Sequence, residues 1–350
     1  MRTYDILNAG PNNRFMANGR IVSNSGKMFQ PHNLPQNHLP DLEDARELVK
    51  AGDFDAVEFL YPSVSRVLSE LIRTAIIPAP GKKFIVADFS AIEARVIAWL
   101  AGEEWVLEVF RGHGKIYEAT AAQMFKVPFE AVTKGSSLRK QGKVAVLALG
   151  YGGGAGALEA MDYGKAIPPE ERDPIKKMWR TANPNIVKWW WAVGDAAMDA
   201  TKNPGVRYRA GKVSFIREHG FLFCDMPDGN RLCYPKPRIR WGKKYDREQL
   251  TYEGTDQLHP QWGEISTYGP KLVENVTQSL ARAALTYGML KTTEAGHEIV
   301  LHVHDEAVVE ADMDTPVSEV EDLLATLPAW AEGLPMRADG FETPFYRKDG

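Results

Sequence analysis

A short apolar segment that ends in an acidic residue constrains this 350-residue chain more than any other feature. Residues 84–87, Phe-Ile-Val-Ala, predict a buried strand that runs into Asp88. Apolar residues then recur every three or four positions from residue 91, which predicts a helix with Ser90 as its N-cap and Glu93 as the capping-box partner. A carboxylate buried at such a turn is costly unless a positive group, such as a metal ion, meets it. A plain helix start is the alternative for Asp88 and Ser90.

A second acidic turn lies more than two hundred positions further along the chain. Residues 299–303 and 307–311 each predict a strand, and His304-Asp305-Glu306 stands at their junction, so this segment is a candidate hairpin. Adjacent carboxylates repel each other, and hard divalent cations relieve that repulsion. Two such acidic tips suit one shared site for two magnesium ions. An ordinary surface turn is the alternative.

The third stretch, residues 138–158, predicts a cationic helix that ends in a run of glycines. Arg139, Lys143, Leu147 and Tyr151 are each four residues apart, so on a helix they form one slowly drifting stripe. Two cations, an apolar group and an aromatic ring suit a ligand with a phosphate tail, a sugar and a base. The glycines let the backbone pass closely by such a ligand. A solvated basic face is the alternative for the two cations.

Taken together and in this order, the three stretches resemble the three polymerase motifs of the family A DNA polymerases, most closely the bacteriophage members. DFSAIEARV is similar to the first motif, RKQGKVAVLALGYG to the second and VHDE to the third. The resemblance implies an α+β fold, in which a right-hand polymerase palm of antiparallel sheet and helices carries a helical fingers insertion, with the thumb largely absent. It places an N-terminal segment and the first part of the palm at 1–100, the fingers at 101–266 and the second part of the palm at 267–350.

The reaction that the resemblance implies is template-directed addition of deoxynucleotides to a primer 3′-OH, in phage DNA replication. Its partners would be a DNA template–primer and deoxynucleoside triphosphates, and its cofactor two Mg²⁺ ions, with Mn²⁺ as a substitute. Glu93 would exclude a ribose 2′-OH and so select deoxynucleotides. The implied catalytic residues are Asp88, Asp305, Glu306 and Lys143; the nucleotide-binding residues are Arg139, Lys143, Leu147, Tyr151, Glu93 and Tyr117; the DNA-binding residues are Arg20, Gln278, Asn275, His304 and Arg282; and the metal-binding residues are Asp88, Asp305 and Phe89.

The chain departs from the family's common pattern at several positions. Leu147 stands where Phe or Tyr usually packs on the incoming sugar, Ala91 replaces a glutamine, and Tyr117 replaces a histidine that helps to bind the triphosphate. Asn275 lies one residue off the usual spacing, whereas Gln278 is the firmest match on its predicted helix. These departures remove polar contacts to the substrate and leave the metal-binding carboxylates in place.

The start of the sequence departs most from the family pattern. Arg20, in an Asn-Gly-Arg segment, matches an arginine that contacts the primer end in the minor groove, and an idle surface arginine is its alternative. Family members carry a thumb, and often an exonuclease domain, before this segment. We therefore expect a fragment, a reduced enzyme, or a split gene product that needs a separate thumb or exonuclease polypeptide or a processivity factor. Weak processivity and no proofreading are expected of this polypeptide alone.

Composition and local pattern add several expectations. The net charge of −4 does not exclude a basic cleft, because cations cluster at 134–143 and 235–244. No apolar run is long enough to span a bilayer, so we expect no membrane partner and a cytoplasmic location, in the host cell for a phage-encoded protein.

Cys224 and Cys233 are predicted to face each other across a hairpin as reduced thiols. Further helices are predicted at 41–51, 54–75, 105–111, 116–125, 129–133, 269–293 and 315–328, with one or two helices within 168–202 and a β-hairpin within 207–241.

Three rival functions remain open at this point. A single-subunit RNA polymerase uses similar aspartates, but it lacks a glutamate at the position of Glu93 and usually has serine where Glu306 stands, so these two residues favour DNA. An inactive DNA-binding protein would normally have lost the metal-binding carboxylates first. A two-metal nuclease does not explain the stripe from Arg139 to Tyr151.

Overall fold

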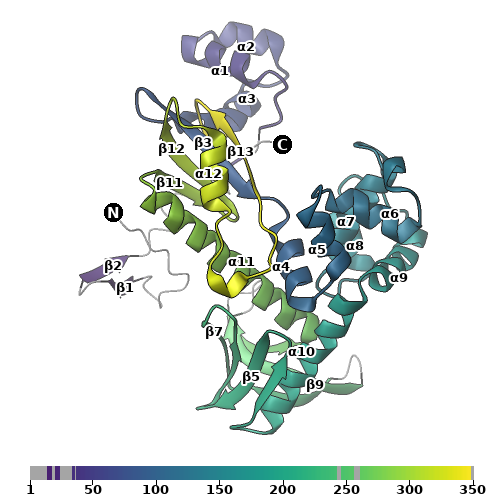
Figure 1. Ribbon diagram of the computed structural model, residues 1–350. Coiled ribbons are helices and arrows are strands. Elements are labelled where there is room, and N and C mark those ends of the chain that lie inside the picture. Colours follow the sequence, from purple (N-terminus) through teal and green to yellow (C-terminus); the bar gives the residue numbers. More distant parts are fainter. Residues whose placement is uncertain are drawn as a thin grey trace. The chain divides into compact units, whose positions relative to one another are not determined.

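A computed structural model describes residues 14–17, 20–23, 34, 35, 37–242, 246–255 and 261–347 (Figure 1). Contacts between residues divide the chain into two compact units. The first unit comprises residues 1–88, 292–321 and 340–350, and the second comprises 89–291 and 322–339. Each unit is described by itself, and the palm and fingers bounds at 1–100, 101–266 and 267–350 stay a prediction.

The first unit is built on a four-stranded sheet with the strand order β11-β12-β3-β13. The strands are β3 (Lys82–Phe89), β11 (Glu298–Val303), β12 (Glu306–Asp312) and β13 (Ala338–Thr343). β12 pairs antiparallel with both β11 and β3. Residues 84–87 of β3 are buried, as expected of an apolar run in an inner strand. The predicted strand at 84–87 and the predicted hairpin are thus confirmed.

Three short helices complete most of the first unit: α1 (Leu42–Ala51), α2 (Phe54–Leu60) and α3 (Val64–Leu71). The single helix predicted over 54–75 is wrong, because Pro62 stands between α2 and α3 and cannot continue a helix. Ser63 then starts α3 by accepting a hydrogen bond from the backbone N–H of Arg66. The chain beyond α3 makes only a 3₁₀ turn at Ile72–Ala75. Helix α12 (Val317–Leu324) confirms the core of the helix predicted over 315–328.

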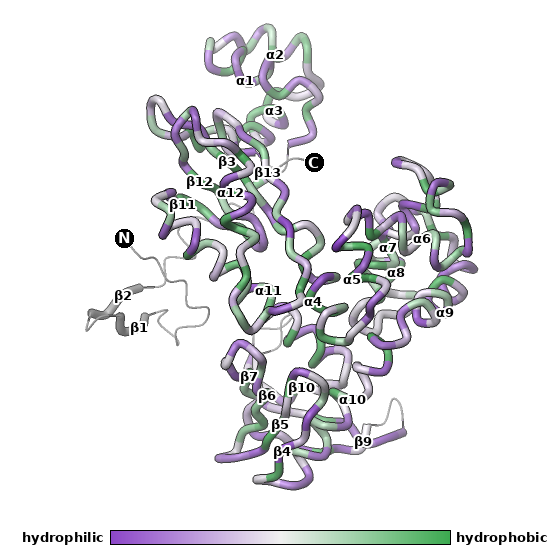
Figure 2. Tube along the Cα trace, viewed as in Figure 1, coloured by the Kyte–Doolittle hydropathy of each residue, from purple (hydrophilic) through white to green (hydrophobic). Residues whose placement is uncertain are grey.

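Helices make up the first part of the second unit. They are α4 (Ile92–Ala101), α5 (Glu104–Arg111), α6 (Ile116–Phe125), α7 (Ser137–Leu149), α8 (Ala155–Met161), α9 (Arg172–Ala182) and α10 (Pro184–Lys202). Figure 2 shows hydrophobic and hydrophilic residues alternating along α9, the pattern of a helix with one face in a core. Trp179 and Trp190 are buried and stack with ring centroids 5.9 Å apart. This pair therefore contributes to the core of the second unit.

Two antiparallel sheets follow the helices. The first is a meander of β4 (Arg207–Ala210), β5 (Val213–Glu218), β6 (Phe221–Asp225) and β7 (Arg231–Pro235), which contains the predicted hairpin. The second has the order β10-β9-β8, with β8 (Arg238–Gly242), β9 (Arg247–Thr255) and β10 (Trp262–Thr267), and was not predicted. The segment predicted as helical fingers therefore also carries these two sheets. The long helix α11 (Gly269–Glu294) comes next, as predicted.

The two cysteines do not face each other as predicted. The β6–β7 register pairs Phe223 with Cys233 and Cys224 with Leu232, so the two thiols project from opposite faces of the sheet. Both are free, Cys224 is buried and Cys233 is exposed. Burial raises the pKa of the Cys224 thiol to about 12, so this thiol stays protonated and unreactive near neutral pH.

The native protein is therefore expected to titrate as one fast thiol with a disulfide reagent at about pH 8, and as two thiols after unfolding. Cys233→Ser should remove the fast reaction, whereas Cys224→Ser should leave it unchanged. Two fast thiols in the native state would contradict the burial of Cys224.

Candidate active site

The two acidic segments meet at one end of the sheet in the first unit. The antiparallel register of β3 and β12 sets Asp88 directly opposite Glu306. Residues opposite each other in such a pair have Cα atoms about 4.5–5.5 Å apart. Asp305 immediately precedes Glu306, in the loop between β11 and β12. The predicted convergence of two acidic tips is thus confirmed, whereas the roles of these residues stay predictions.

The loop that carries Asp305 is as short as a hairpin allows. Val303 pairs with Glu306, so only His304 and Asp305 lie between the strands. Two-residue hairpins need a positive φ at the first loop position, and His304 has φ 56° there. A side chain in this region costs about 1 kcal/mol relative to glycine. The tight loop holds both carboxylates close to the end of β3.

Glu306 is the most enclosed of the three carboxylates. Its exposed fraction is 2%, whereas Asp88 and Asp305 are half-buried. The hydroxyl of Tyr346 donates to Glu306 Oε1 over 2.8 Å. Burial and this carboxylate together raise the pKa of Tyr346, so the phenol stays protonated and acts as the donor. Tyr346 lies close to the end of the chain, and no local pattern in the sequence pointed to it.

The donor set at this tip fits a hard divalent cation. Asp88 and Asp305 offer carboxylate oxygens, and Phe89, whose side chain is buried and apolar, offers only its backbone carbonyl. Within the described part of the chain, no three or more His, Cys, Asp or Glu residues are grouped to hold a metal. Mg²⁺ usually binds through one or two carboxylates together with water and substrate phosphates, so a full protein cage is not required.

The turn from β3 into α4 differs from its prediction. Ser90 does not cap the helix; Ala91 occupies the N-cap position with φ 51° and makes no side-chain cap bond. The carbonyl of Ser90 instead accepts from Arg95 Nε at 2.6 Å, and its N–H donates to the carbonyl of Arg337. The buried guanidinium of Arg95 thereby shapes the turn that follows Asp88. Glu93 is consequently not a capping-box partner.

Glu93 instead meets Tyr151, within the second unit. The Tyr151 hydroxyl donates to Glu93 Oε2 over 2.7 Å. Burial, and then the charge of Glu93, raise the pKa of Tyr151 well above its usual value, so this hydroxyl stays protonated. α7 ends at Leu149, so Tyr151 lies just beyond the helix. The predicted sugar-selecting glutamate and this predicted nucleotide-binding tyrosine thus lie in direct contact.

The cationic stripe lies on α7 and faces α6. Lys143 and Leu147 are exposed, and Arg139 is partly buried. The Arg139 guanidinium and the Lys143 ammonium lie 5.7 and 6.0 Å from the centroid of the Tyr117 ring. Arg139 Nε also donates to Glu118 Oε1 at 2.6 Å. Three of the predicted triphosphate-binding residues therefore lie together, with Glu118 as a neighbour that the sequence reading missed.

A glycine explains why these two helices approach so closely. A Cβ atom on Gly142 would lie 2.2 Å from the backbone oxygen of Tyr117. Only glycine fits this contact, because no real Cβ approaches an oxygen so closely. Gly142 therefore allows α7 to pack on the backbone of α6 and brings Tyr117 beside Lys143.

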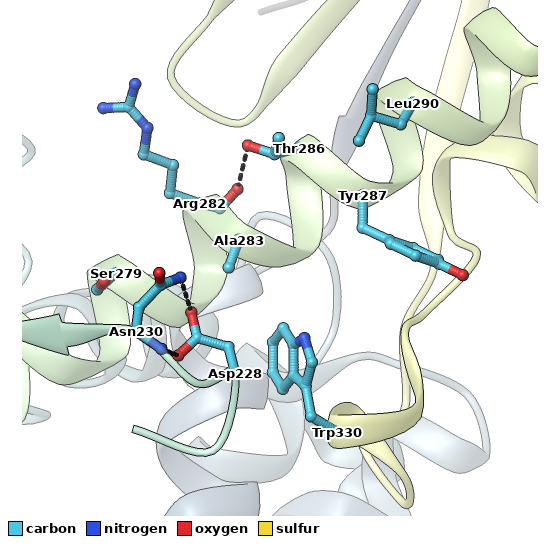
Figure 3. Close-up of a pocket in the computed structure, with 9 residues that line it drawn as sticks. All are labelled: Asp228, Asn230, Ser279, Arg282, Ala283, Thr286, Tyr287, Leu290 and Trp330. Carbon is cyan, nitrogen blue, oxygen red and sulfur yellow. Dashed lines mark hydrogen bonds between the residues drawn. The ribbon is translucent and has the colours of Figure 1, made fainter. Parts of the chain in front are cut away.

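Helix α11 carries the predicted DNA contacts. Gln278 and Arg282 are exposed, and Asn275 Nδ2 donates to the Tyr234 hydroxyl at 3.1 Å. A shallow hollow of about 390 Å³ lies along the helix beside Arg282. Figure 3 shows the Arg282 side chain pointing away from the Asp228–Asn230 turn, which borders the hollow together with Trp330. All of these residues belong to the second unit.

The predicted contact at Arg20 is described only by its backbone. Arg20 is the first residue of β2 (Arg20–Ser23), which pairs antiparallel with β1 (Arg14–Ala17). Its side chain lies outside the described residues, as do Asn18, Gly19 and residues 29–33. The role of Arg20 stays a prediction.

Comparison with known proteins agrees with the resemblance of the motifs. The model of DNA polymerase family A matches residues 62–198. A DNA polymerase of Bacillus phage SP02 is 50% identical over 328 residues, which are 93% of this chain and 50% of that protein. DNA polymerase I of Rhizobium leguminosarum is 26% identical over 77% of this chain and 23% of that protein. The chain thus spans half or less of the length of these relatives.

A solved structure shows the same fold. The POL domain of Pol1 from M. smegmatis, in complex with DNA primer-template and dNTP, is similar with a TM-score of 0.54 and 18% identity. The match covers 79% of this chain and 42% of that one. At this identity the match shows the fold alone. The chain is thus similar to DNA polymerases of family A over most of its length.

Among the described helices, none combines the length and the apolar character that crossing a bilayer requires.

Proposed function

We propose that this chain adds deoxynucleotides to a primer 3′-OH under the direction of a DNA template and releases pyrophosphate, in phage DNA replication in the host cytoplasm. The observation that carries the proposal is the register that sets Asp88 opposite Glu306, with Asp305 beside it. The similarity to DNA polymerases of family A supports the same activity. The substrates would be a DNA primer–template and deoxynucleoside triphosphates.

The acidic tip is proposed to hold two Mg²⁺ ions, with Mn²⁺ as a substitute. Asp88 and Asp305 would bind them through carboxylate oxygens, and Phe89 through its carbonyl. Bound there, the ions would lower the pKa of the primer 3′-OH and neutralise charge on the triphosphate. Glu306 and His304 would lie beside the primer end.

The α6–α7 cluster is proposed to bind the triphosphate. Arg139 and Lys143 supply positive charge one helical turn apart, which stabilises the charge that develops as the phosphate bond breaks. Lys143 would also give a proton to the departing pyrophosphate. Tyr117 lies beneath both cations and supports them through its ring. Exposed Leu147, further along the same stripe, would pack on the sugar.

The pair of Glu93 and Tyr151 is proposed to select the sugar and to respond to fingers closure. The bond from the Tyr151 hydroxyl to Glu93 supports this role, because it holds the carboxylate in one orientation. A ribose 2′-OH would meet that carboxylate, whereas a deoxyribose would not. Tyr151 would stack near the templating base and move as the fingers close.

The DNA duplex is proposed to lie along α11, where Gln278, Arg282 and Asn275 would meet the minor groove, with Arg20 as a further contact. The exposure of Gln278 and Arg282 supports this placement. Amide and guanidinium groups suit the acceptor pattern that the minor groove presents for every base pair. A separate thumb or exonuclease polypeptide, or a processivity factor, would supply functions beyond this chain.

The proposal is tested by extension of a labelled primer on a DNA template with Mg²⁺, with deoxynucleotides and ribonucleotides in parallel reactions. We expect short products, deoxynucleotide preference, loss of activity in EDTA and no excision of a mismatched 3′ end. Preferential ribonucleotide extension would assign an RNA polymerase instead. Binding of the primer–template without extension would assign a DNA-binding protein, and primer degradation a nuclease.

A further inference from the structure

The last described residues of the chain tie two parts of the first unit together. Phe345 is buried in the core of α1–α3, together with Leu42, Val57 and Val67. The next residue, Tyr346, has no exposed surface and packs in a separate cluster, with Val308 of β12 and residues 84 and 86 of β3. Its backbone N–H donates to the carbonyl of Ile76 at 2.9 Å. Tyr346 is thus held by its backbone and its ring, independently of its hydroxyl.

The hydroxyl makes a contact that packing alone does not require. It donates to Glu306 Oε1 at 2.8 Å, and both residues are buried, at 0% and 2% exposure. A phenylalanine would fill the same volume without this bond. A buried carboxylate that loses a donor is destabilised by about 1–3 kcal/mol, more when it is charged. The bond therefore restricts the orientations that the Glu306 carboxylate can adopt.

The location of this bond links it to the proposed chemistry. Glu306 is the first residue of β12, directly opposite Asp88 and next to Asp305. A rotation of the Glu306 side chain would move its negative charge relative to the two aspartates and to the proposed position of the primer end. A displacement of about 1 Å in a catalytic group reduces the reaction rate strongly, because the reacting groups must be aligned.

We propose that Tyr346 is a positioning residue of the polymerase site, which acts through Glu306 by holding that carboxylate in the orientation used beside the two aspartates. This inference rests on the proposed polymerase function and deepens it. Tyr346 contacts neither substrate nor metal in this role; its effect on catalysis passes through the one hydrogen bond to Glu306.

The central variant is Tyr346→Phe, which keeps the ring and removes the hydroxyl. We expect kcat for single-nucleotide extension to fall about tenfold, as the loss of one hydrogen bond to a charged group implies. The KM for the nucleotide and the dissociation constant of the primer–template should change less than about twofold, because Tyr346 contacts neither the nucleotide nor the DNA in this role.

A double-mutant cycle with Glu306→Ala separates positioning from general loosening of the fold. If Tyr346 acts through Glu306, Tyr346→Phe should reduce kcat by less than about twofold when Glu306 is already alanine. The same coupling should be visible without metal or substrate, as a shift of the urea unfolding midpoint that is larger in the wild-type background than in Glu306→Ala. Equal effects of Tyr346→Phe in both backgrounds would overturn the proposal.

Two control variants complete the design. Tyr61→Phe removes another tyrosine hydroxyl that donates to a carboxylate in the same unit, to Asp41 Oδ2 at 2.7 Å, and should leave kcat unchanged. Phe345→Leu loosens the adjacent core and should lower the unfolding midpoint while kcat at about 25 °C is kept. If Phe345→Leu lowers kcat as much as Tyr346→Phe does, the effect is structural and the proposal fails.

The cycle also distinguishes failure of this inference from failure of the proposed function. If wild type does not extend primers, the polymerase assignment fails, and the unfolding cycle still reports whether Tyr346 and Glu306 are coupled. If wild type extends primers and Tyr346→Phe matches it in kcat, Tyr346 is no positioning residue, and the polymerase assignment stands.

Discussion

Asp305→Asn is expected to abolish primer extension, with a fall in the single-turnover rate of about a thousandfold or more. The substitution keeps the shape of the side chain in the two-residue loop and removes its negative charge. A neutral amide oxygen binds a hard cation much more weakly than a carboxylate, and the several kcal/mol that metal ions contribute to such a reaction correspond to this range. The measurement is the rate of one nucleotide addition at saturating deoxynucleotide and Mg²⁺.

Binding of the primer–template should survive this change, because Asp305 is expected to meet metal ions and not DNA phosphates. Fluorescence anisotropy with a labelled duplex should therefore give a dissociation constant within about threefold of wild type. Asp314→Asn is the matched control, since Asp314 is an exposed aspartate in the turn beyond the far end of β12, and it should keep the wild-type rate. If Asp305→Asn keeps more than about a tenth of the wild-type rate, Asp305 is not a metal ligand. The polymerase assignment then loses its main support.

The elements that the sequence predicted well are those whose signal is local. β3 is a continuous apolar run, the β11–β12 hairpin alternates around a polar junction, and α7 begins at a serine N-cap. Each of these patterns is determined by residues within a few positions of one another. The pairing of Asp88 with Glu306 is different, because the order of strands in a sheet depends on packing across the whole unit. The sequence predicted a shared acidic site from the two acidic tips, but not the register that sets Asp88 opposite Glu306.

Several features could not be predicted, for identifiable physical reasons. Ser90 has the sequence signature of an N-cap, but the buried guanidinium of Arg95 binds its carbonyl and gives the turn another shape. The β8–β10 sheet has largely exposed strands, so the apolar alternation that marks a strand is weak. Ion pairs of Arg238 and Arg240 with Glu264 join its strands instead. The bond from Tyr346 to Glu306 depends on tertiary packing alone.

Lys143→Met is the second large effect that we expect, with a fall in kcat/KM for deoxynucleotides of about a hundredfold to a thousandfold. Arg139 and Lys143 share the ring of Tyr117, but they differ in their surroundings. Arg139 is engaged by Glu118, whereas Lys143 is exposed and has no carboxylate within ion-pair distance among the residues that the structure describes. The Lys143 ammonium is therefore the charge that a phosphate would meet directly. Removal of one such preorganised donor costs about this factor in other enzymes.

Pre-steady-state measurements separate the effect of Lys143→Met on the rate of nucleotide addition from its effect on the apparent dissociation constant of the incoming nucleotide. If Lys143 stabilises the developing charge and gives the proton, most of the loss should be in the rate, whereas simple binding of the triphosphate would raise the dissociation constant at an unchanged rate. Lys143→Arg keeps the charge and should recover binding more than rate, because a guanidinium does not readily give up a proton. Lys140→Met is the matched control, since Lys140 is an exposed lysine of the same helix outside the four-residue spacing of the stripe. An equal loss in Lys140→Met would mean that α7 acts through its overall positive charge, and the specific role of Lys143 would have to be abandoned.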